Sequence, residues 1–221
     1  MRFVGRQLAG VFLAATLLFA QAGARELLDR VAITVGLDVI TEQEIYQQLR
    51  IAAFLDGKEP AFTQPNLRET ADRMVMQRLL LLDMRANGFP MPSEQDLDAA
   101  LVSTKRENWG SVEAFEAAAL EAGLDPMAIR LFLRSALATV RYIDFRFRPA
   151  VRVSEESILE RYMERFPEDA VESVAPVPSA EQVREALEEE LIEEAITANI
   201  DQWLEDARAR AGVRYLPEVL P

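Results

Sequence analysis

Acidic residues that lie close together in the chain are the first candidates for chemistry, because paired carboxylates can act as acid and base or bind a metal ion. The candidate groups are Glu42 with Glu44, Glu155 with Glu156, and the run from Glu188 to Glu190. Catalytic carboxylates need a pocket that separates their pKa values. These groups instead fall in the first turns or on the exposed faces of predicted helices, where a carboxylate complements the helix dipole or stays hydrated. We interpret them as structural.

The residue types that the chain lacks narrow the chemistry further. It has neither cysteine nor histidine. Without cysteine there can be no disulfide, thiol nucleophile or CxxC redox site, and without histidine no Ser-His-Asp triad or ordinary zinc site. No GxxxxGK[ST] phosphate loop occurs either. We therefore expect that the protein is not an enzyme. We expect no catalytic residue, no bound cofactor and no metal ion.

Aromatic and methionine side chains near predicted helix ends are the candidates for a binding surface. They are Phe54, Trp109, Tyr142, Phe145, Phe147, Met163 and Phe166. Such side chains adapt to varied apolar partners, as in promiscuous peptide grooves. Tyr142, Phe145 and Phe147 cannot all face one side of a helix, so we expect at least one to point away from the core. Ordinary core and edge packing is the alternative for each residue.

A row of arginines lies along the helix predicted over residues 125–148. It consists of Arg130, Arg134, Arg141, Arg146 and Arg148, in a chain with a net charge of −13. The row could dock an acidic partner or a lipid headgroup. We favour ion pairs with acidic residues of neighbouring helices.

The helices that carry these side chains can be located from their capping signals. Thr41 with Glu44, and Ser93 with Asp96, have the spacing of a capping box. Asp125 precedes a proline that suits the first helical position. Together with apolar residues at helical spacing, these signals predict helices over residues 41–55, 66–87, 93–106, 111–122, 125–148, 154–165 and 179–211.

Strand-like residues lie only near the two ends of the predicted helical region. Residues 31–41 read as two short strands around Gly36, and Val213 to Leu216 read as a third. Pairing them requires the long last helix to return to the N-terminal core, with Trp203 as a packing residue. We therefore predict a mainly α fold, a helical bundle in which a small β element pairs the N-terminal hairpin with the C-terminal strand.

Three segments carry a family resemblance, namely Val31 to Glu44, Phe115 to Leu124 and Trp203 to Leu216. In this order they resemble the N-terminal module of the SurA-type periplasmic chaperones, and the resemblance covers most of residues 27–216. SurA and PrsA carry a prolyl isomerase (parvulin) domain before the returning helix. Here the corresponding stretch, residues 167–178, is too short, since even a small folded domain needs ~50 residues. The resemblance therefore implies the chaperone module without the parvulin domain.

The first 24 residues have the pattern of a secretory signal. Arg2 and Arg6 precede an apolar run, and a small-residue cleavage site ends at Ala24. The run is shorter than the ~20 residues that span a bilayer, so we expect no membrane span after cleavage; a retained anchor is the alternative. We predict a periplasmic protein with residues 25–221 as one domain. Within it lie a helical core over 41–166, a proline-rich linker over 167–178, and a returning helix and strand over 179–216.

These observations together predict an exported, ATP-independent chaperone-like protein that binds unfolded or extended segments of envelope proteins, including outer-membrane proteins. The net charge of −13 argues against nucleic acid as a partner. We expect no nucleotide to bind. The sequence does not indicate how many copies of the chain assemble. The alternative is a non-catalytic scaffold with one fixed envelope partner, and a peptidyl-prolyl isomerase is a more distant third.

Overall fold

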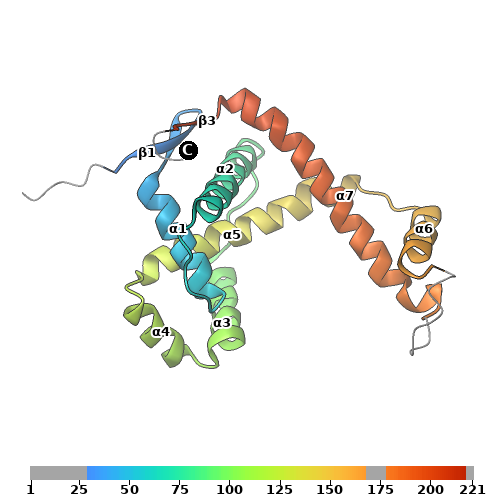
Figure 1. Cartoon of the computed structure of the whole chain (residues 1–221), viewed down its shortest axis with the longest axis horizontal. Coiled ribbons are helices and arrows are strands. Elements are labelled where there is room, and N and C mark those ends of the chain that lie inside the picture. Colours follow the sequence, from blue (N-terminus) through green and yellow to red (C-terminus); the bar gives the residue numbers. More distant parts are fainter. Residues whose placement is uncertain (1–28, 168–177, 218–221) are drawn as a thin grey trace, which may run out of the picture.

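The computed structural model describes residues 29–167 and 178–217 (Figure 1). Helices dominate this part of the chain, and three short strands form one small antiparallel sheet. The predicted mainly α fold with a small β element is thus confirmed. The expected signal sequence lies outside the described residues, as does most of the expected linker. Over the described ranges, no helix combines the length and the apolar character needed to cross a bilayer.

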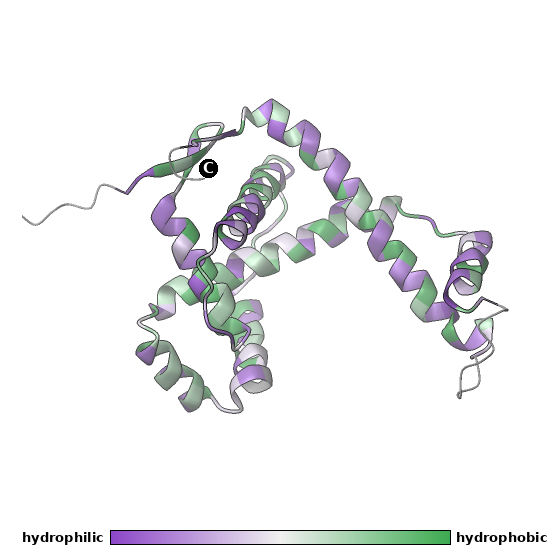
Figure 2. Ribbon diagram, viewed as in Figure 1, coloured by the Kyte–Doolittle hydropathy of each residue, from purple (hydrophilic) through white to green (hydrophobic). Residues whose placement is uncertain are grey.

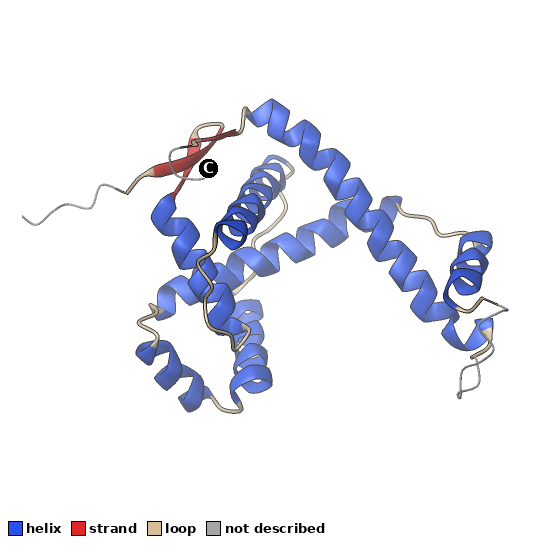
Figure 3. Ribbon diagram, viewed as in Figure 1, coloured by secondary structure: helices blue, strands red, loops and turns tan. Residues whose placement is uncertain are grey.

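The sheet joins the two ends of the described region. Strands β1 (Val31–Val35) and β2 (Asp38–Thr41) form a hairpin, and β3 (Arg214–Tyr215) pairs with the other edge of β1, so that the order is β2-β1-β3 (Figure 3). Gly36 makes the hairpin turn with a φ of 62°, which an L side chain rarely adopts. Its N–H donates to the carbonyl of Ala211 at 2.8 Å, which ties the turn to the end of the last helix.

The helices follow the predicted segments closely. They are α1 (Glu42–Leu55), α2 (Gln64–Ala86), α3 (Glu94–Trp109), α4 (Val112–Glu121), α5 (Pro126–Phe147), the 3-10 turn η1 (Arg148–Ala150), α6 (Glu155–Arg165) and α7 (Ala180–Ala211). The capping boxes are present: the Thr41 hydroxyl accepts from the Glu44 N–H at 3.2 Å, and the Glu44 carboxylate accepts from the Thr41 N–H at 2.9 Å. Ser93 and Asp96 repeat this arrangement.

Two helix bounds differ from the prediction by more than one residue. Helix α2 begins at Gln64 rather than at residue 66, because Thr63 is its cap and accepts from the Asn66 N–H at 3.4 Å. Pro65 therefore lies inside the first turn, where a missing N–H costs nothing. Helix α3 continues past residue 106 to Trp109 and stops at Gly110, whose φ is 72°.

The apolar core has three clusters that share helices. The first joins the sheet to α1, α2 and the end of α7, through residues such as Ile33, Val75 and Leu204. The second joins α2, α5 and α7, and the third joins α1, α3, α4 and α5. Helix α2 contributes to two of the clusters, because its buried residues include Val75 in the first and Leu80 in the second. Figure 2 shows hydrophobic and hydrophilic residues alternating along α7, which fits a helix that buries one side.

Helix α6 and the N-terminal half of α7 extend away from the rest of the molecule, and we call them the arm (Figure 1). Ile158 and Leu187 are buried where the two helices meet. Arg161 bridges them by donating to Glu190 at 2.6 Å and to Glu194 at 2.7 Å. The arm therefore rests on few apolar contacts and several charged hydrogen bonds.

Candidate functional site

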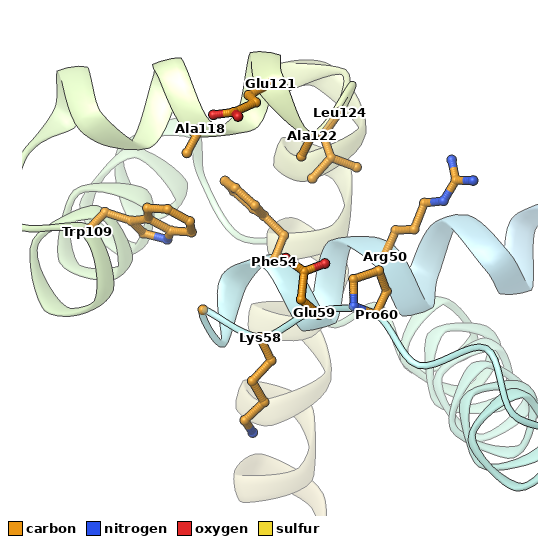
Figure 4. A pocket seen from close by; sticks show the side chains of 11 residues that line it. Arg50, Phe54, Lys58, Glu59, Pro60, Trp109, Ala118, Glu121, Ala122 and Leu124 are labelled. Atoms are coloured by element: carbon orange, nitrogen blue, oxygen red, sulfur yellow. The ribbon is translucent and has the colours of Figure 1, made fainter.

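A groove of about 570 Å³ lies where the last turn of α1 and the loop after it face α4 (Figure 4). We call it the aromatic groove. Its apolar lining consists of Phe54, Pro60, Trp109, Ala118, Ala122 and Leu124. Its charged lining consists of Arg50, Lys58, Glu59 and Glu121. Two of the seven predicted binding residues, Phe54 and Trp109, thus share one surface depression.

The two aromatic rings of the groove are held by helix ends. Phe54 and Trp109 stack with centroids 4.6 Å apart and planes 26° apart, and buried Phe115 packs edge-on against Phe54 at 5.3 Å. The Asn108 side-chain amide donates to the Leu55 carbonyl at 2.7 Å, which joins the end of α3 to the end of α1. Aromatic pairs in such geometries gain about 0.5–1.5 kcal/mol beyond their area burial. The groove wall is therefore preformed.

The indole nitrogen of Trp109 adds a polar feature to this apolar wall. The side chain as a whole is half-buried, but its Nε1 is covered and has no hydrogen-bond partner among the described residues. An unpaired buried donor of this kind costs about 1–3 kcal/mol. Because this nitrogen is covered, a group bound in the groove does not reach it, and the cost stays with the fold.

The charges at the groove differ in their surroundings. Lys58 pairs with Asp56 at 3.2 Å, and the Arg50 guanidinium lies 5.7 Å from the centroid of the Phe62 ring. Glu59 and Glu121 form no ion pair with any described residue. Figure 4 shows these two carboxylates on opposite sides of the rings, while Lys58 points away.

Two other predicted binding residues are core residues. Tyr142 is only 1% exposed, and its hydroxyl donates to Asp83 at 2.8 Å and accepts from Asn87 at 3.0 Å. Burial, and then the bond to Asp83, raise the pKa of Tyr142. Phe147 is buried and packs edge-on against Trp203 with centroids 6.0 Å apart, so Trp203 is the packing residue that was predicted.

The remaining three predicted residues lie elsewhere. Phe145 is 60% exposed at the end of α5 and contacts Phe89, so one of the three aromatics of this segment does point away from the core. Met163 is also 60% exposed, and Phe166 is half-buried, both at the end of the arm. The seven residues therefore do not form one continuous surface.

Sequence reasoning missed several residues of the aromatic groove. Glu59 lies in a loop and Glu121 in a last helical turn, and neither position stands out in the sequence. A signal for the hollow does exist in and directly after α4, where Ala118 and Ala122 place small side chains at the groove. Small residues beside large ones leave unfilled space when helices pack.

The arginine row pairs with acidic residues, as predicted. The pairs are Arg130 and Arg134 with Glu94, Arg141 with Asp96, Arg146 with Asp83, and Arg148 with Glu189 and Glu193. The hydrogen bond from Arg130 lowers the pKa of Glu94, and the one from Arg141 lowers the pKa of Asp96. These arginines are therefore engaged within the fold.

Most of the acidic residues that opened the sequence analysis also have partners within the fold. Glu42 pairs with Arg30 at 2.7 Å, Glu44 closes a capping box, and Glu155 pairs with Arg184. In the part of the chain that the structure describes, no three carboxylates gather in a way that could hold a metal ion.

Compared with models of protein families and with curated proteins, the chain matches none. The geometry of its own surface is therefore the basis for a functional proposal.

Proposed function

We propose that this protein is an exported, ATP-independent chaperone-like protein of the SurA N-terminal type, which holds unfolded or extended segments of envelope proteins. The aromatic groove carries the proposal. It is a depression of about 570 Å³ walled by half-buried Trp109, which stacks on the buried ring of Phe54, and it is large enough for one or two client side chains. Capture of such segments lowers the concentration of the aggregation-prone state without any nucleotide.

Exposed apolar residues outside the groove support binding of long segments rather than of one small molecule. Phe145 and Met163 are each 60% exposed, and Leu159 beside Met163 on the arm is 51% exposed. A client chain that touches several such points gains avidity although each contact is weak. Affinity for one segment is modest, because an extended chain loses conformational entropy on binding.

The location and release steps of the proposal rest on the sequence. The basic, apolar and small-residue pattern of residues 1–24 supports export to the periplasm. A net charge of −13 keeps a protein soluble while it exposes apolar groups. Release then follows from folding of the client or from transfer to another protein.

A dedicated scaffold is the second candidate, and one observation favours it. Phe54, Tyr142 and Phe147 are at least nine-tenths buried, so the free apolar area is smaller than the sequence suggested. A small, fixed surface suits a single folded partner better than varied clients.

Light scattering of an unfolded outer-membrane protein, diluted from denaturant, separates the two candidates. The chain without residues 1–24 is added over a range of ratios, with no ATP. Suppression of aggregation at near-stoichiometric ratios supports a holding chaperone. If a wide excess leaves scattering unchanged while one stoichiometric partner is recovered from envelope extract, the scaffold is the better description.

A further inference from the structure

A second hollow, of about 320 Å³, lies on the other flank of α4 from the aromatic groove. Glu116 and Leu120 of α4 line this hollow, whereas Ala118 and Glu121 of the same helix line the groove. We call the second hollow the lysine pocket. Its apolar lining, from α3, α4, α5 and the loop between the last two, includes Leu101, Phe115, Ala119, Leu120, Leu124 and Ile129. A hollow of this size with a mostly apolar wall has the character of a binding pocket.

Lys105 places a buried charge in the wall of this pocket. The residue is only 8% exposed, and its ammonium lies 3.1 Å from a carboxylate oxygen of Glu116 and 5.0 Å from the centroid of the Phe115 ring. Glu116 lines the pocket too and its side chain is 66% exposed, so the ammonium lies near the pocket opening. One ammonium proton is donated to Glu116, and the other two have no acceptor among the described residues. The wall therefore offers donors to an acceptor oxygen.

The two charges that line the lysine pocket, Lys105 and Glu116, balance each other. An anionic ligand would compete with Glu116 for the ammonium, and a cationic ligand would compete with Lys105 for the carboxylate. A neutral oxygen, in contrast, can accept from a second ammonium proton while the ion pair stays intact. The pocket therefore suits an apolar group with a neutral acceptor oxygen beside it. In a polypeptide, every apolar side chain has a main-chain carbonyl in that position.

The lysine pocket and the aromatic groove meet at Leu124, which lines both. Leu124 follows the C-terminal end of α4, so a chain that lies in the groove can pass this end and continue into the pocket. At the rim of the pocket, Leu120 is 81% exposed and adds apolar area to this path. Two joined hollows of this kind fit an extended chain better than a compact small molecule.

We propose that the lysine pocket binds an apolar side chain of the same extended polypeptide segment that occupies the aromatic groove. Lys105 donates to the main-chain carbonyl beside that side chain, and Leu120 covers the side chain from the rim. This inference rests on the proposed holding function and adds to it a second contact point. Because the charges of the pocket balance, the contact selects for apolar side chains and not for acidic or basic neighbours.

Binding of a capped, uncharged, leucine-containing peptide to the full chain tests this contact. The peptide carries a neutral dye, and fluorescence anisotropy measures its affinity. Leu120→Ser should weaken binding about fivefold, because apolar contact at the rim is lost. The matched control is Leu37→Ser, since Leu37 is fully exposed in the hairpin turn and lines neither hollow. Both leucines are exposed, so neither change should disturb the fold.

The two members of the ion pair provide the decisive comparison. Lys105→Met should weaken binding about tenfold, because the carbonyl loses a charged donor, whereas Glu116→Gln should leave the affinity within about twofold. Circular dichroism checks that both variants keep the fold. Equal weakening by both would mean that the ion pair only shapes the pocket, and the carbonyl contact would be wrong.

The remaining outcomes separate this inference from the holding function. If neither Leu120→Ser nor Lys105→Met changes peptide affinity while client aggregation is still suppressed, clients bind elsewhere and the inference about this pocket fails. If dodecanoate binds with a dependence on Lys105 and no peptide does, the ligand is a lipid-like acid and the polypeptide assignment is overturned. Absence of both peptide binding and suppression of aggregation would overturn the holding function itself.

Discussion

The rings of Phe54 and Trp109 stack with their centroids 4.6 Å apart, although each belongs to the end of a different helix. Helix α1 ends one residue after Phe54, and α3 ends at Trp109 itself. The position of the stack is therefore set by where the two helices stop, and the Asn108 bond to the Leu55 carbonyl fixes these ends relative to each other.

Filling the aromatic groove should weaken holding without unfolding the protein. Ala118 is half-buried and lines the groove from α4, so Ala118→Leu places three extra carbons against the aromatic pair. We expect suppression of client aggregation to fall severalfold, with a loss of unfolding free energy below about 1–2 kcal/mol, since the added atoms enter open space rather than packed core. Ala117→Leu on the same helix is the control, because Ala117 is exposed and does not line the groove. Equal holding by both variants would place client binding elsewhere.

Removing one hydroxyl at the junction of α2 and α5 should weaken the fold. Tyr142 donates to Asp83 and accepts from Asn87, and both partners lose a bond in Tyr142→Phe. Arg146 still pairs with Asp83 at 2.9 Å, so we expect a loss of about 1 kcal/mol in the urea unfolding free energy. Tyr46→Phe is the matched control, because the structure shows no hydrogen bond for its hydroxyl among the described residues. A loss of the same size in the control would mean that the network contributes nothing.

Stability should decline in the alkaline range as Tyr215 loses its phenolic proton. Burial, followed by the hydrogen bond to Asp72, raises the pKa of Tyr215 to about 12. An unfolded tyrosine titrates near ~10, so the folded protein holds this proton more tightly. The resulting stabilisation is complete below pH ~10 and is lost as the pH rises toward about 12. Thermal unfolding from pH 8 upward measures this, and Tyr215→Phe should flatten the decline; an unchanged profile in that variant would assign the decline to other groups.

The arm should loosen when its central arginine is neutralised. Arg161→Gln removes the hydrogen bonds to Glu190 and Glu194 that link α6 to α7. We expect faster amide hydrogen exchange in α6, with little change in α2 and α5, because the rest of the core does not depend on this contact. Arg85→Gln, an exposed arginine with no ion pair among the described residues, should leave exchange in α6 as it is.

Acid should loosen the arm in the same way. Hydrogen bonds from Arg165 and Arg161 lower the pKa of Glu190 from its ordinary 4.5, and Arg161 lowers that of Glu194. Their stabilisation is therefore present above pH 4.5 and is lost as the pH falls through the lowered values. Exchange in α6 that stays constant from pH 6 to pH 3, after correction for the intrinsic rate, would contradict this account.

Local features of the chain were predicted well because their causes are local. Thr41, Ser93 and Asp125 cap the helices that they were expected to cap, and the strands near the two ends pair as expected. The start of α2 was placed too late because Pro65 was read as part of the loop rather than of the first helical turn.

The binding surface was harder to predict, because exposure depends on how helices cross. Nothing in the sequence separates Phe145, which is exposed, from Phe147, which is buried two positions later in the same helix. Likewise, charge alone predicts that the arginines of the row meet carboxylates. The pairing of Arg148, in η1, with Glu189 depends on the path of α7 past the end of α5. Glu59 and Glu121 line the same groove only through that kind of long-range packing.

The sheet order has a consequence for how the molecule acquires its structure. The β1–β2 hairpin can form as soon as those residues are available, but the second edge of β1 is covered only by β3, and Ala32 accepts from Leu216 at 2.8 Å beyond it. Pairing β1 with β3 closes a loop that contains all the helices, and such long-range pairing is slow. In the meantime the uncovered edge of β1 can pair with a strand of another molecule. A newly made chain therefore carries, until its last helix has returned, the same hazard of intermolecular strand pairing from which a holding protein protects others.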